Sequence, residues 1–193
     1  MSATCRPADN PFASHRVETL GFRSATLEWC DLMQRLDSLG GRAAMVGPKG
    51  SGKTTLLEEL ALRLEQPVVV RIPGSCPRPW RTVRAQLPRP VTQRHAILVD
   101  GSEQLGVVGW RRLLHATRRA RCLIATVHKP GRLPTLIECR TTSGLLRDLV
   151  KELAPADTSN LQFGLDGLFQ RHEGNLRSCF RELYDVYAGR IRS

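Results

Sequence analysis

Residues 47–54 read Gly-Pro-Lys-Gly-Ser-Gly-Lys-Thr, so that two glycines separated by four residues precede a lysine and a threonine. This spacing is typical of loops whose backbone N–H groups surround a phosphate, because glycine permits the backbone angles that turn successive N–H groups inward. Such a loop joins a strand to a helix. The octet therefore constrains both the ligand class and the fold class of this chain.

The flanking segments agree with that arrangement. Residues 42–46 form a short apolar run of strand length, and residues 54–65 carry leucines among good helix formers. In this geometry Lys53 would neutralise phosphate oxygens and the Thr54 hydroxyl would ligate Mg²⁺. The alternative is a glycine-rich turn without a ligand. The residues predicted to bind the nucleotide are Gly47, Pro48, Lys49, Gly50, Ser51, Gly52, Lys53, Thr54 and Thr55.

A second acidic site is expected because Mg²⁺ takes oxygen ligands and phosphates alone do not position it. Residues 96–100, Ala-Ile-Leu-Val-Asp, form an apolar strand that ends in an acid. A parallel strand of this kind places Asp100 at the carboxyl edge of the sheet, where open α/β folds bind ligands. We therefore predict that Thr54 and Asp100 share one Mg²⁺.

Strand and helix patterns alternate along the first three quarters of the chain, which predicts an α/β fold of three layers with a five-stranded parallel sheet. After residue 141 only helical spacing remains, which predicts a small helical lid. The domains expected are an N-terminal arm (1–23), a nucleotide-binding core (24–141) and the lid (142–193). The strands expected are 42–46, 67–72, 96–100, 122–127 and 135–139, and the helices are 24–39, 54–65, 107–120, 145–153, 161–171 and 176–187, with one helical turn near 82–86.

The composition of the 193 residues narrows the setting. The sequence contains no run of about 18 apolar residues, so no membrane span is predicted. The first residues also lack the apolar core of a signal peptide. The six cysteines show no metal-binding or redox-pair spacing. A cytoplasmic protein is the resulting expectation.

The formal net charge of +11 is concentrated between residues 66 and 137. Residues 66–99 and 104–137 contain no Asp or Glu. On a helix over 107–120, Arg111, Arg112, His115, Arg118 and Arg119 would form one basic face. This basic region predicts contact with nucleic-acid phosphates or with an acidic partner protein, the alternative being a charged surface that only keeps the protein in solution.

With these motifs in place, the chain resembles the P-loop ATPases of the additional-strand division, and within it the AAA+ group. Asn10-Pro11-Phe12 is similar to the segment before the nucleotide pocket in origin-recognition-like and transposition-helper-like members. Gly174-Asn175-Leu176-Arg177 is similar to the second sensor of the family, in which an arginine opening a lid helix reaches the γ-phosphate. The alternative is a helix stop and an N-cap. The resemblance implies ATP and Mg²⁺ as cofactors and a catalytic role for Arg177.

Most AAA+ members carry a glutamate directly after the magnesium aspartate, and Gly101 occupies that position here. A small residue there, followed by Glu103, resembles the NACHT branch of signalling ATPases, so Glu103 is the predicted catalytic base. Its alternative is a carboxylate that stabilises a helix N-terminus. The resemblance also implies a first sensor at the end of the 122–127 strand, with His128 as the first choice and Thr126 as the second. An oligomer is possible, but no arginine can be named from the sequence as a finger between subunits, although Arg132 lies in the matching part of the chain before the last strand.

Three functions remain open from the sequence. The first is an ATP-driven switch or motor subunit that hydrolyses ATP with Lys53, Glu103, His128 and Arg177. The second is a small nucleotide or metabolite kinase, which would also accept an Asp-Gly pair after a strand. The third is a nucleotide-regulated binding module that does not hydrolyse, as Gly101 would allow.

Overall fold

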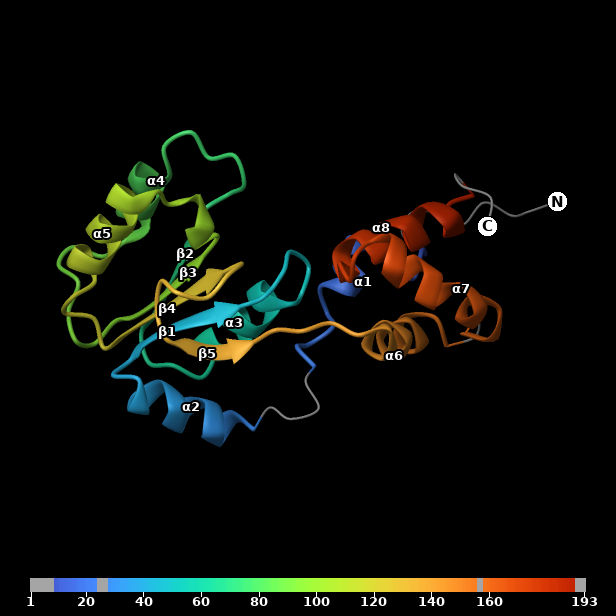
Figure 1. The fold of residues 1–193 in the computed structure, drawn as a ribbon, viewed down its shortest axis with the longest axis horizontal. Coiled ribbons are helices and arrows are strands. Elements are labelled where there is room, and N and C mark those ends of the chain that lie inside the picture. The colour runs from blue at the N-terminus through green and yellow to red at the C-terminus, as the bar shows by residue number, and fades with distance from the viewer. Residues whose placement is uncertain (1–8, 24–27, 156–157, 190–193) are drawn as a thin grey trace. The chain divides into compact units, whose positions relative to one another are not determined.

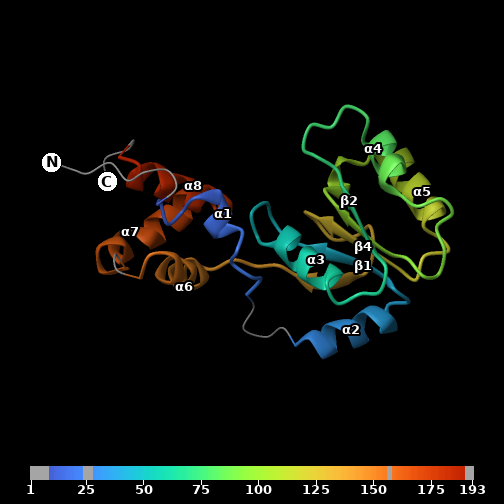
Figure 2. The same ribbon diagram turned by 180° about the vertical axis from the view of Figure 1, so that it is seen from behind.

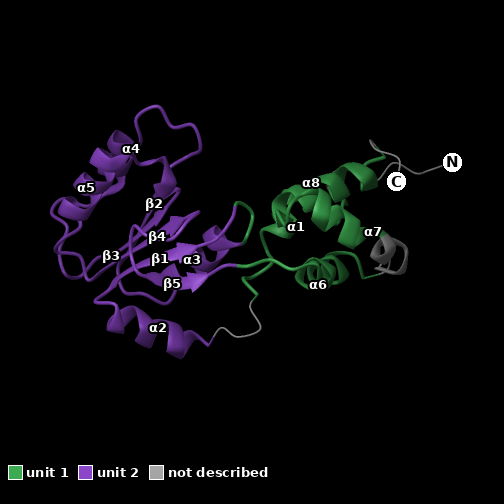
Figure 3. Ribbon diagram, viewed as in Figure 1, with its two compact units in different colours: residues 1–23, 49–51, 140–193 green, residues 24–48, 52–139 purple. Residues whose placement is uncertain are grey.

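The computed structural model describes residues 9–23, 28–155 and 158–189 (Figure 1). The chain divides into two compact units, coloured separately in Figure 3. Unit 2 comprises residues 24–48 and 52–139, and unit 1 comprises residues 1–23, 49–51 and 140–193. The first unit boundary after the sheet therefore lies at 139/140. Among the described residues, none of the helices combines the length and apolarity that a bilayer crossing requires.

Unit 2 is built on a five-stranded sheet in which every pairing is parallel. The strand order is β2-β3-β4-β1-β5, which places β4 between β1 and β3 (Figures 1 and 2). The prediction of an α/β fold with a five-stranded parallel sheet is confirmed, and the arrangement is compatible with three layers. The strands are β1 (Arg42–Val46), β2 (Pro67–Arg71), β3 (Ala96–Asp100), β4 (Cys122–Val127) and β5 (Thr135–Glu138).

The central strands are buried on both faces, because helices cover the sheet on two sides. One face carries Ile97 and Leu123, which pack against Val83 of α4 (Pro79–Gln86) and Leu113 of α5 (Val107–Ala116). Alternation along β3 sends Leu98 to the opposite face. There α3 (Lys53–Ala61) lies against β2, β3 and β4, and α2 (Trp29–Ser38) lies against β5. The two faces explain why these strands read as continuous apolar runs.

The parallel register brings the carboxyl ends of the inner strands together. Met45 of β1 is paired with Thr126 of β4, and Val99 of β3 is paired with Ala125. The next residues in that register, Asp100 and Thr126, therefore lie side by side at the edge from which α3 begins. This edge holds the predicted nucleotide-binding residues of unit 2.

Unit 1 packs four helices around its own apolar core: α1 (Ser14–Val17), α6 (Ser143–Leu153), α7 (Thr158–Arg171) and α8 (Leu176–Tyr187). Phe12 is 3 % exposed and contacts the rings of Phe180 and Tyr187. The Asn10 side chain donates to the Tyr184 carbonyl and accepts from the Phe12 amide. Residues 9–23 are thus part of the helical unit rather than a separate arm, because Phe12 and Leu20 bury apolar surface there. Residues 1–8 of the expected arm lie outside the described part.

Several element boundaries differ from the sequence-based expectations, and α3, for example, ends at Ala61 rather than at residue 65. Helix α5 ends at Ala116 rather than at residue 120. Directly after Ala116 the Thr117 hydroxyl donates to the Leu113 carbonyl and the chain turns toward β4. Helix α4 covers eight residues where one turn was expected, since Pro79 occupies its first position and Val83 is buried. A short 3-10 turn, η1 (Ser102–Gln104), follows β3. The start expected for the first long helix, residues 24–27, lies outside the described residues.

Candidate functional site

The predicted phosphate loop connects β1 to α3, as the sequence pattern requires. Gly50 and Gly52 adopt left-handed backbone angles, with φ of 77° and 82°. Side chains with a Cβ rarely take these angles, so glycine at both positions is explained by the backbone. Gly52 directly precedes α3, and the first N–H groups of that helix carry its partial positive charge at the same end. These features fit a phosphate-binding cradle.

Lys53 is held inside the loop, and its residue is only 8 % exposed. Its Nζ donates to the carbonyl oxygens of Gly47, at 2.8 Å, and of Pro48, at 2.6 Å. A buried ammonium with carbonyl partners at the first turn of a helix is a cation aimed at the loop interior rather than at solvent. Burial raises the pKa of the nearby Cys139 thiol to about 11, although the charge of Lys53 opposes that increase.

The side chains of Thr54 and Asp100 meet across the edge of the sheet. The Thr54 hydroxyl donates to Asp100 Oδ2 at 2.9 Å, and the Thr126 hydroxyl donates to Asp100 Oδ1 at 2.9 Å. The carboxylate therefore has one hydroxyl on each oxygen. A carboxylate beside a hydroxyl offers the hard oxygen ligands that Mg²⁺ prefers, so these residues fit a magnesium ion completed by phosphate oxygens. Among the described residues no three His, Cys, Asp or Glu side chains gather as a metal-binding group.

Thr126 is buried deeply, at 1 % exposure, and organises the residues after β3. Its hydroxyl also accepts the Gly101 amide at 3.0 Å, and its carbonyl accepts the Ser102 hydroxyl at 2.6 Å. The sequence ranked Thr126 below His128 as a sensor. The structure places Thr126, rather than His128, in contact with Asp100. The contact of Ser102 was not anticipated, although residues that follow neighbouring parallel strands are expected to meet.

The backbone at Gly101 leaves no room for a side chain in its present position. Its φ is 77°, and a Cβ built on it would lie 2.2 Å from the Ile72 carbonyl oxygen. The Ile72 amide donates to the Asp100 carbonyl at 2.9 Å, which holds the Ile72 backbone beside Asp100. Any residue with a side chain at position 101 would therefore require the backbone to shift, which is a local steric reason for glycine here.

Glu103 lies in η1 and faces His128, which directly follows β4. The distance between His128 Nε2 and Glu103 Oε1 is 3.5 Å. The Glu103 Oε2 atom is buried and, within the part of the chain that the structure describes, has no hydrogen-bond partner. A buried carboxylate oxygen without a partner is costly unless it serves a ligand or a reaction. The structure therefore brings the predicted base and the predicted first sensor together, as a pair.

Arg132 is held within its own chain. Its guanidinium donates to the carbonyl oxygens of Ser102 and Leu105, at 3.0 Å and 2.8 Å, and lies 5.1 Å from the ring centre of Trp110. These contacts fix the turn that carries Glu103. The sequence did not identify an arginine finger, and the contacts of Arg132 give this residue a structural role in the turn.

Arg177 is exposed and lies in the first turn of α8 in unit 1. The Asn175 side chain caps that helix by accepting the Ser178 amide at 3.2 Å. Gly174, with φ of 77°, ends the preceding helix. The helix stop and N-cap that the sequence offered as an alternative are thus both present. The approach of Arg177 to a γ-phosphate stays a prediction.

The basic region contains arginines of two kinds. Arg71 pairs with Glu58, and Arg121 pairs with Glu65, so both are engaged. Arg118 and Arg119 lie in the turn after α5, which corrects the expected five-residue basic helical face, because the helix ends before them. Arg111 and Arg112 remain on α5 and are exposed.

Comparison with known proteins adds no relative. No protein-family model matches the chain, and no curated protein is significantly similar to it. The site must therefore be interpreted from its own geometry.

Proposed function

We propose that this protein binds a nucleoside triphosphate, ATP by resemblance, together with Mg²⁺, and hydrolyses it as an AAA+-like P-loop ATPase that acts as a switch or motor subunit. The observation that carries the proposal is the 2.9 Å hydrogen bond between Thr54 and Asp100. Two residues 46 positions apart meet at the carboxyl edge of the sheet, next to a buried lysine. When bound, Mg²⁺ would neutralise phosphate charge and align the terminal phosphate.

The sheet order supports the same class. Strand β4 is inserted between β1, which leads into the phosphate loop, and β3, which ends in Asp100. An inserted strand in this place is the feature from which the additional-strand division takes its name. The insertion also supplies Thr126 and His128 to the edge where Asp100 lies.

Each residue has a role in the proposed reaction. The loop amides and Lys53 hold the β- and γ-phosphates, and Thr54 with Asp100 positions the metal. Glu103 accepts a proton from the attacking water, and His128, 3.5 Å away, orients its carboxylate. Thr126 fixes Asp100 in the rotamer that faces Thr54. Arg177 would stabilise charge on the γ-phosphate once nucleotide is bound.

Binding is tested with a fluorescent ATP analogue, with and without Mg²⁺, by titration of the full chain. We expect Lys53→Ala to weaken binding by roughly tenfold or more, because it removes a charged partner of the phosphates. Lys151→Ala is the matched control, since Lys151 is an exposed lysine of α6. A wild-type protein with no affinity for any magnesium nucleotide would end the proposal.

Turnover is tested by phosphate release without any added acceptor, which separates an ATPase from a kinase. Glu103→Gln should bind the analogue normally and release phosphate about 10² times more slowly. One observation favours a second candidate, a binding module that does not hydrolyse: the steric exclusion of a side chain at Gly101. Tight binding with no phosphate release, unaltered by Glu103→Gln, would select that module.

A further inference from the structure

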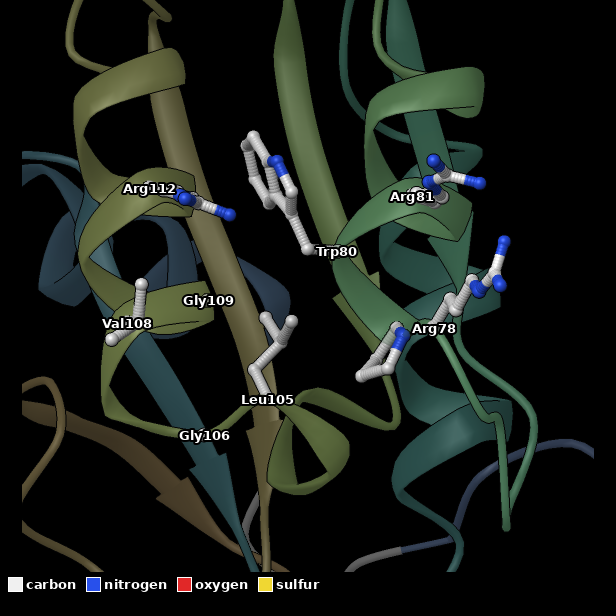
Figure 4. A pocket seen from close by; sticks show the side chains of 9 residues that line it. Arg78, Trp80, Arg81, Leu105, Gly106, Val108, Gly109 and Arg112 are labelled. Atoms are coloured by element: carbon white, nitrogen blue, oxygen red, sulfur yellow. The ribbon is translucent and has the colours of Figure 1, made fainter.

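A groove with a volume of about 340 Å³ lies between α4 and the start of α5 in unit 2 (Figure 4). It belongs to the sheet face that α4 and α5 cover, and no residue of the phosphate loop lines it. The residues that matter for its chemistry are Arg78, Trp80, Arg81, Leu105, Val108 and Arg112.

The floor of the groove is apolar. The side chains of Trp80 and Leu105 project into the space between the two helices (Figure 4). Trp80 packs on the buried core of this face, so its ring is held in place. Gly109 keeps the groove open, since a Cβ there would lie 3.0 Å from the Leu105 Cδ2 atom. The groove is therefore a shaped apolar surface rather than a gap between mobile side chains.

Val108 extends this apolar surface onto α5, where Val107 precedes it. Val107 is 68 % exposed and Val108 is 62 % exposed, and with Leu62 they are the large hydrophobic residues most accessible to water in the described chain. Val108 and Arg112 are one helical turn apart, so they share the side of α5 that borders the groove. Exposed apolar residues beside a pocket mark a surface that a partner covers.

The charged residues along the groove all have one sign. Arg112 of α5 extends toward Trp80, whereas the side chains of Arg78 and Arg81 project from α4 on the side turned away from Trp80 (Figure 4). All three are exposed, and none of their guanidinium groups makes a hydrogen bond or ion pair to another described residue. Residues 66–99 and 104–137 supply no carboxylate to neutralise them. Charge complementarity therefore requires an acidic partner.

We propose that this groove binds a short acidic segment of a partner protein, with an apolar side chain inserted over Trp80, Leu105 and Val108 and with Asp or Glu residues paired to the arginines. Apolar burial would supply affinity, and the arginines would supply orientation and association rate. A nucleic acid is disfavoured as the occupant, because phosphates would pair with the arginines but would leave Val108 and Leu105 uncovered. The volume is at the lower end of the range for binding pockets, about 300–1,000 Å³, which suits an anchor of one or two side chains.

The first experiment selects ligands from a random peptide library, of about 12 residues per peptide, displayed on phage and presented to the full-length protein. Selection is repeated on Arg112→Glu and on Arg119→Glu. The latter is the matched control, because Arg119 is exposed, lies outside the groove and gives the same change of net charge. Wild type and the control should enrich peptides that combine Asp or Glu with Leu, Phe or Trp, whereas Arg112→Glu should not.

The second experiment uses one enriched peptide and the indole N–H signals of the three tryptophans in an NMR spectrum. The Trp80 signal, assigned with Trp80→Phe, should move on titration while the Trp29 signal stays fixed. Val108→Asp should weaken binding about tenfold and Arg81→Glu about three- to fivefold at roughly 0.15 M salt. Unchanged chemical shifts elsewhere in these variants establish that they fold.

Three outcomes would overturn the proposal. The first is a selection without acidic and apolar enrichment. The second is equal loss of affinity in Arg112→Glu and Arg119→Glu, which would indicate only attraction to net positive charge. The third is tighter binding of an oligothymidylate of about 15 nucleotides than of the peptide, with movement of the Trp80 signal and the same dependence on Arg81 and Arg112. That result would assign the groove to single-stranded nucleic acid.

Discussion

Replacing Gly101 with alanine tests the geometry of the residue that follows Asp100. Two costs are expected. A residue with a Cβ at φ of 77° costs about 1–2 kcal/mol, and a Cβ placed 2.2 Å from the Ile72 carbonyl oxygen forces a backbone shift that costs about 1–3 kcal/mol more. Gly101→Ala should therefore lower the free energy of unfolding by about 2–5 kcal/mol.

Two other glycines separate these costs. Gly40 has φ of 65° and no atom within 4 Å of its expected Cβ, so Gly40→Ala should show the dihedral cost alone, about 1–2 kcal/mol. Gly106 has an ordinary φ of −65° and equally open space. Gly106→Ala should change stability by less than about 0.5 kcal/mol. The three variants thus form a graded series.

Urea unfolding followed by tryptophan fluorescence is the suitable assay. Trp29, Trp80 and Trp110 all lie in unit 2, so the signal reports the unit that contains the mutated glycines. With an m-value of about 2 kcal/mol/M, Gly101→Ala should move the midpoint down by roughly 1–2.5 M. Equal midpoints for Gly101→Ala and Gly40→Ala would refute the close approach to Ile72. The steric reason for the absence of a glutamate at position 101 would then fail as well.

Three further results are expected. Thr126→Val keeps the side-chain shape but leaves an Asp100 oxygen and the Gly101 amide without their partner, so it should lower the free energy of unfolding in urea by about 1–3 kcal/mol. Thr126→Ser should lower it clearly less, and equal losses would contradict the hydrogen-bonded role of Thr126. Hydrogen bonds from Arg171, and secondarily from His172, hold the pKa of the Glu182 carboxyl below its ordinary value of 4.5. The ionised carboxylate therefore stabilises the folded helical unit above about pH 4.5, and this stabilisation is lost as the pH falls through the lower pKa of the folded state. Far-UV circular dichroism should accordingly show a shallower acid destabilisation in Glu182→Gln than in wild type or Glu173→Gln. Burial raises the pKa of the Cys139 and Cys179 thiols to about 11. Mass spectrometry after brief iodoacetamide treatment at about pH 8 should therefore find exposed Cys30 alkylated before Cys139 and Cys179, and early modification of Cys139 would contradict its burial.

Local sequence patterns were sufficient wherever one strand or helix determines its own placement. Strands over residues 42–46, 96–100 and 122–127 were predicted with their observed limits, because each is a continuous apolar run bounded by polar residues or glycine. The helix over 176–187 was also predicted, from its Asn175 cap and its apolar spacing. The limits of α5 were not, since its end depends on where Thr117 turns the chain toward the sheet.

The candidate site divides in the same way. Spacing within one loop was enough to indicate Lys53 and Thr54, and the acid at the end of an apolar strand was enough to indicate Asp100. The contact of Thr126, rather than His128, with Asp100 depends on the register of β3 and β4, which pairs Val99 with Ala125 and so aligns the next residues. The role of Arg132 required knowledge of the carbonyl groups of the turn that it contacts.

By itself the sequence determined the glycine-rich loop over residues 47–54, the apolar strand that ends in Asp100 and the helical character of the C-terminal segment. It also determined that the basic region contains no carboxylates over residues 66–99 and 104–137. These follow from spacing, periodicity and composition, which act over a few neighbouring residues. Only the tertiary structure decided that β4 separates β1 from β3, that the Ile72 carbonyl lies against Gly101, and that residues of α4 and α5 line one apolar groove. Those features join residues distant in the chain, and their positions depend on packing that no local pattern records.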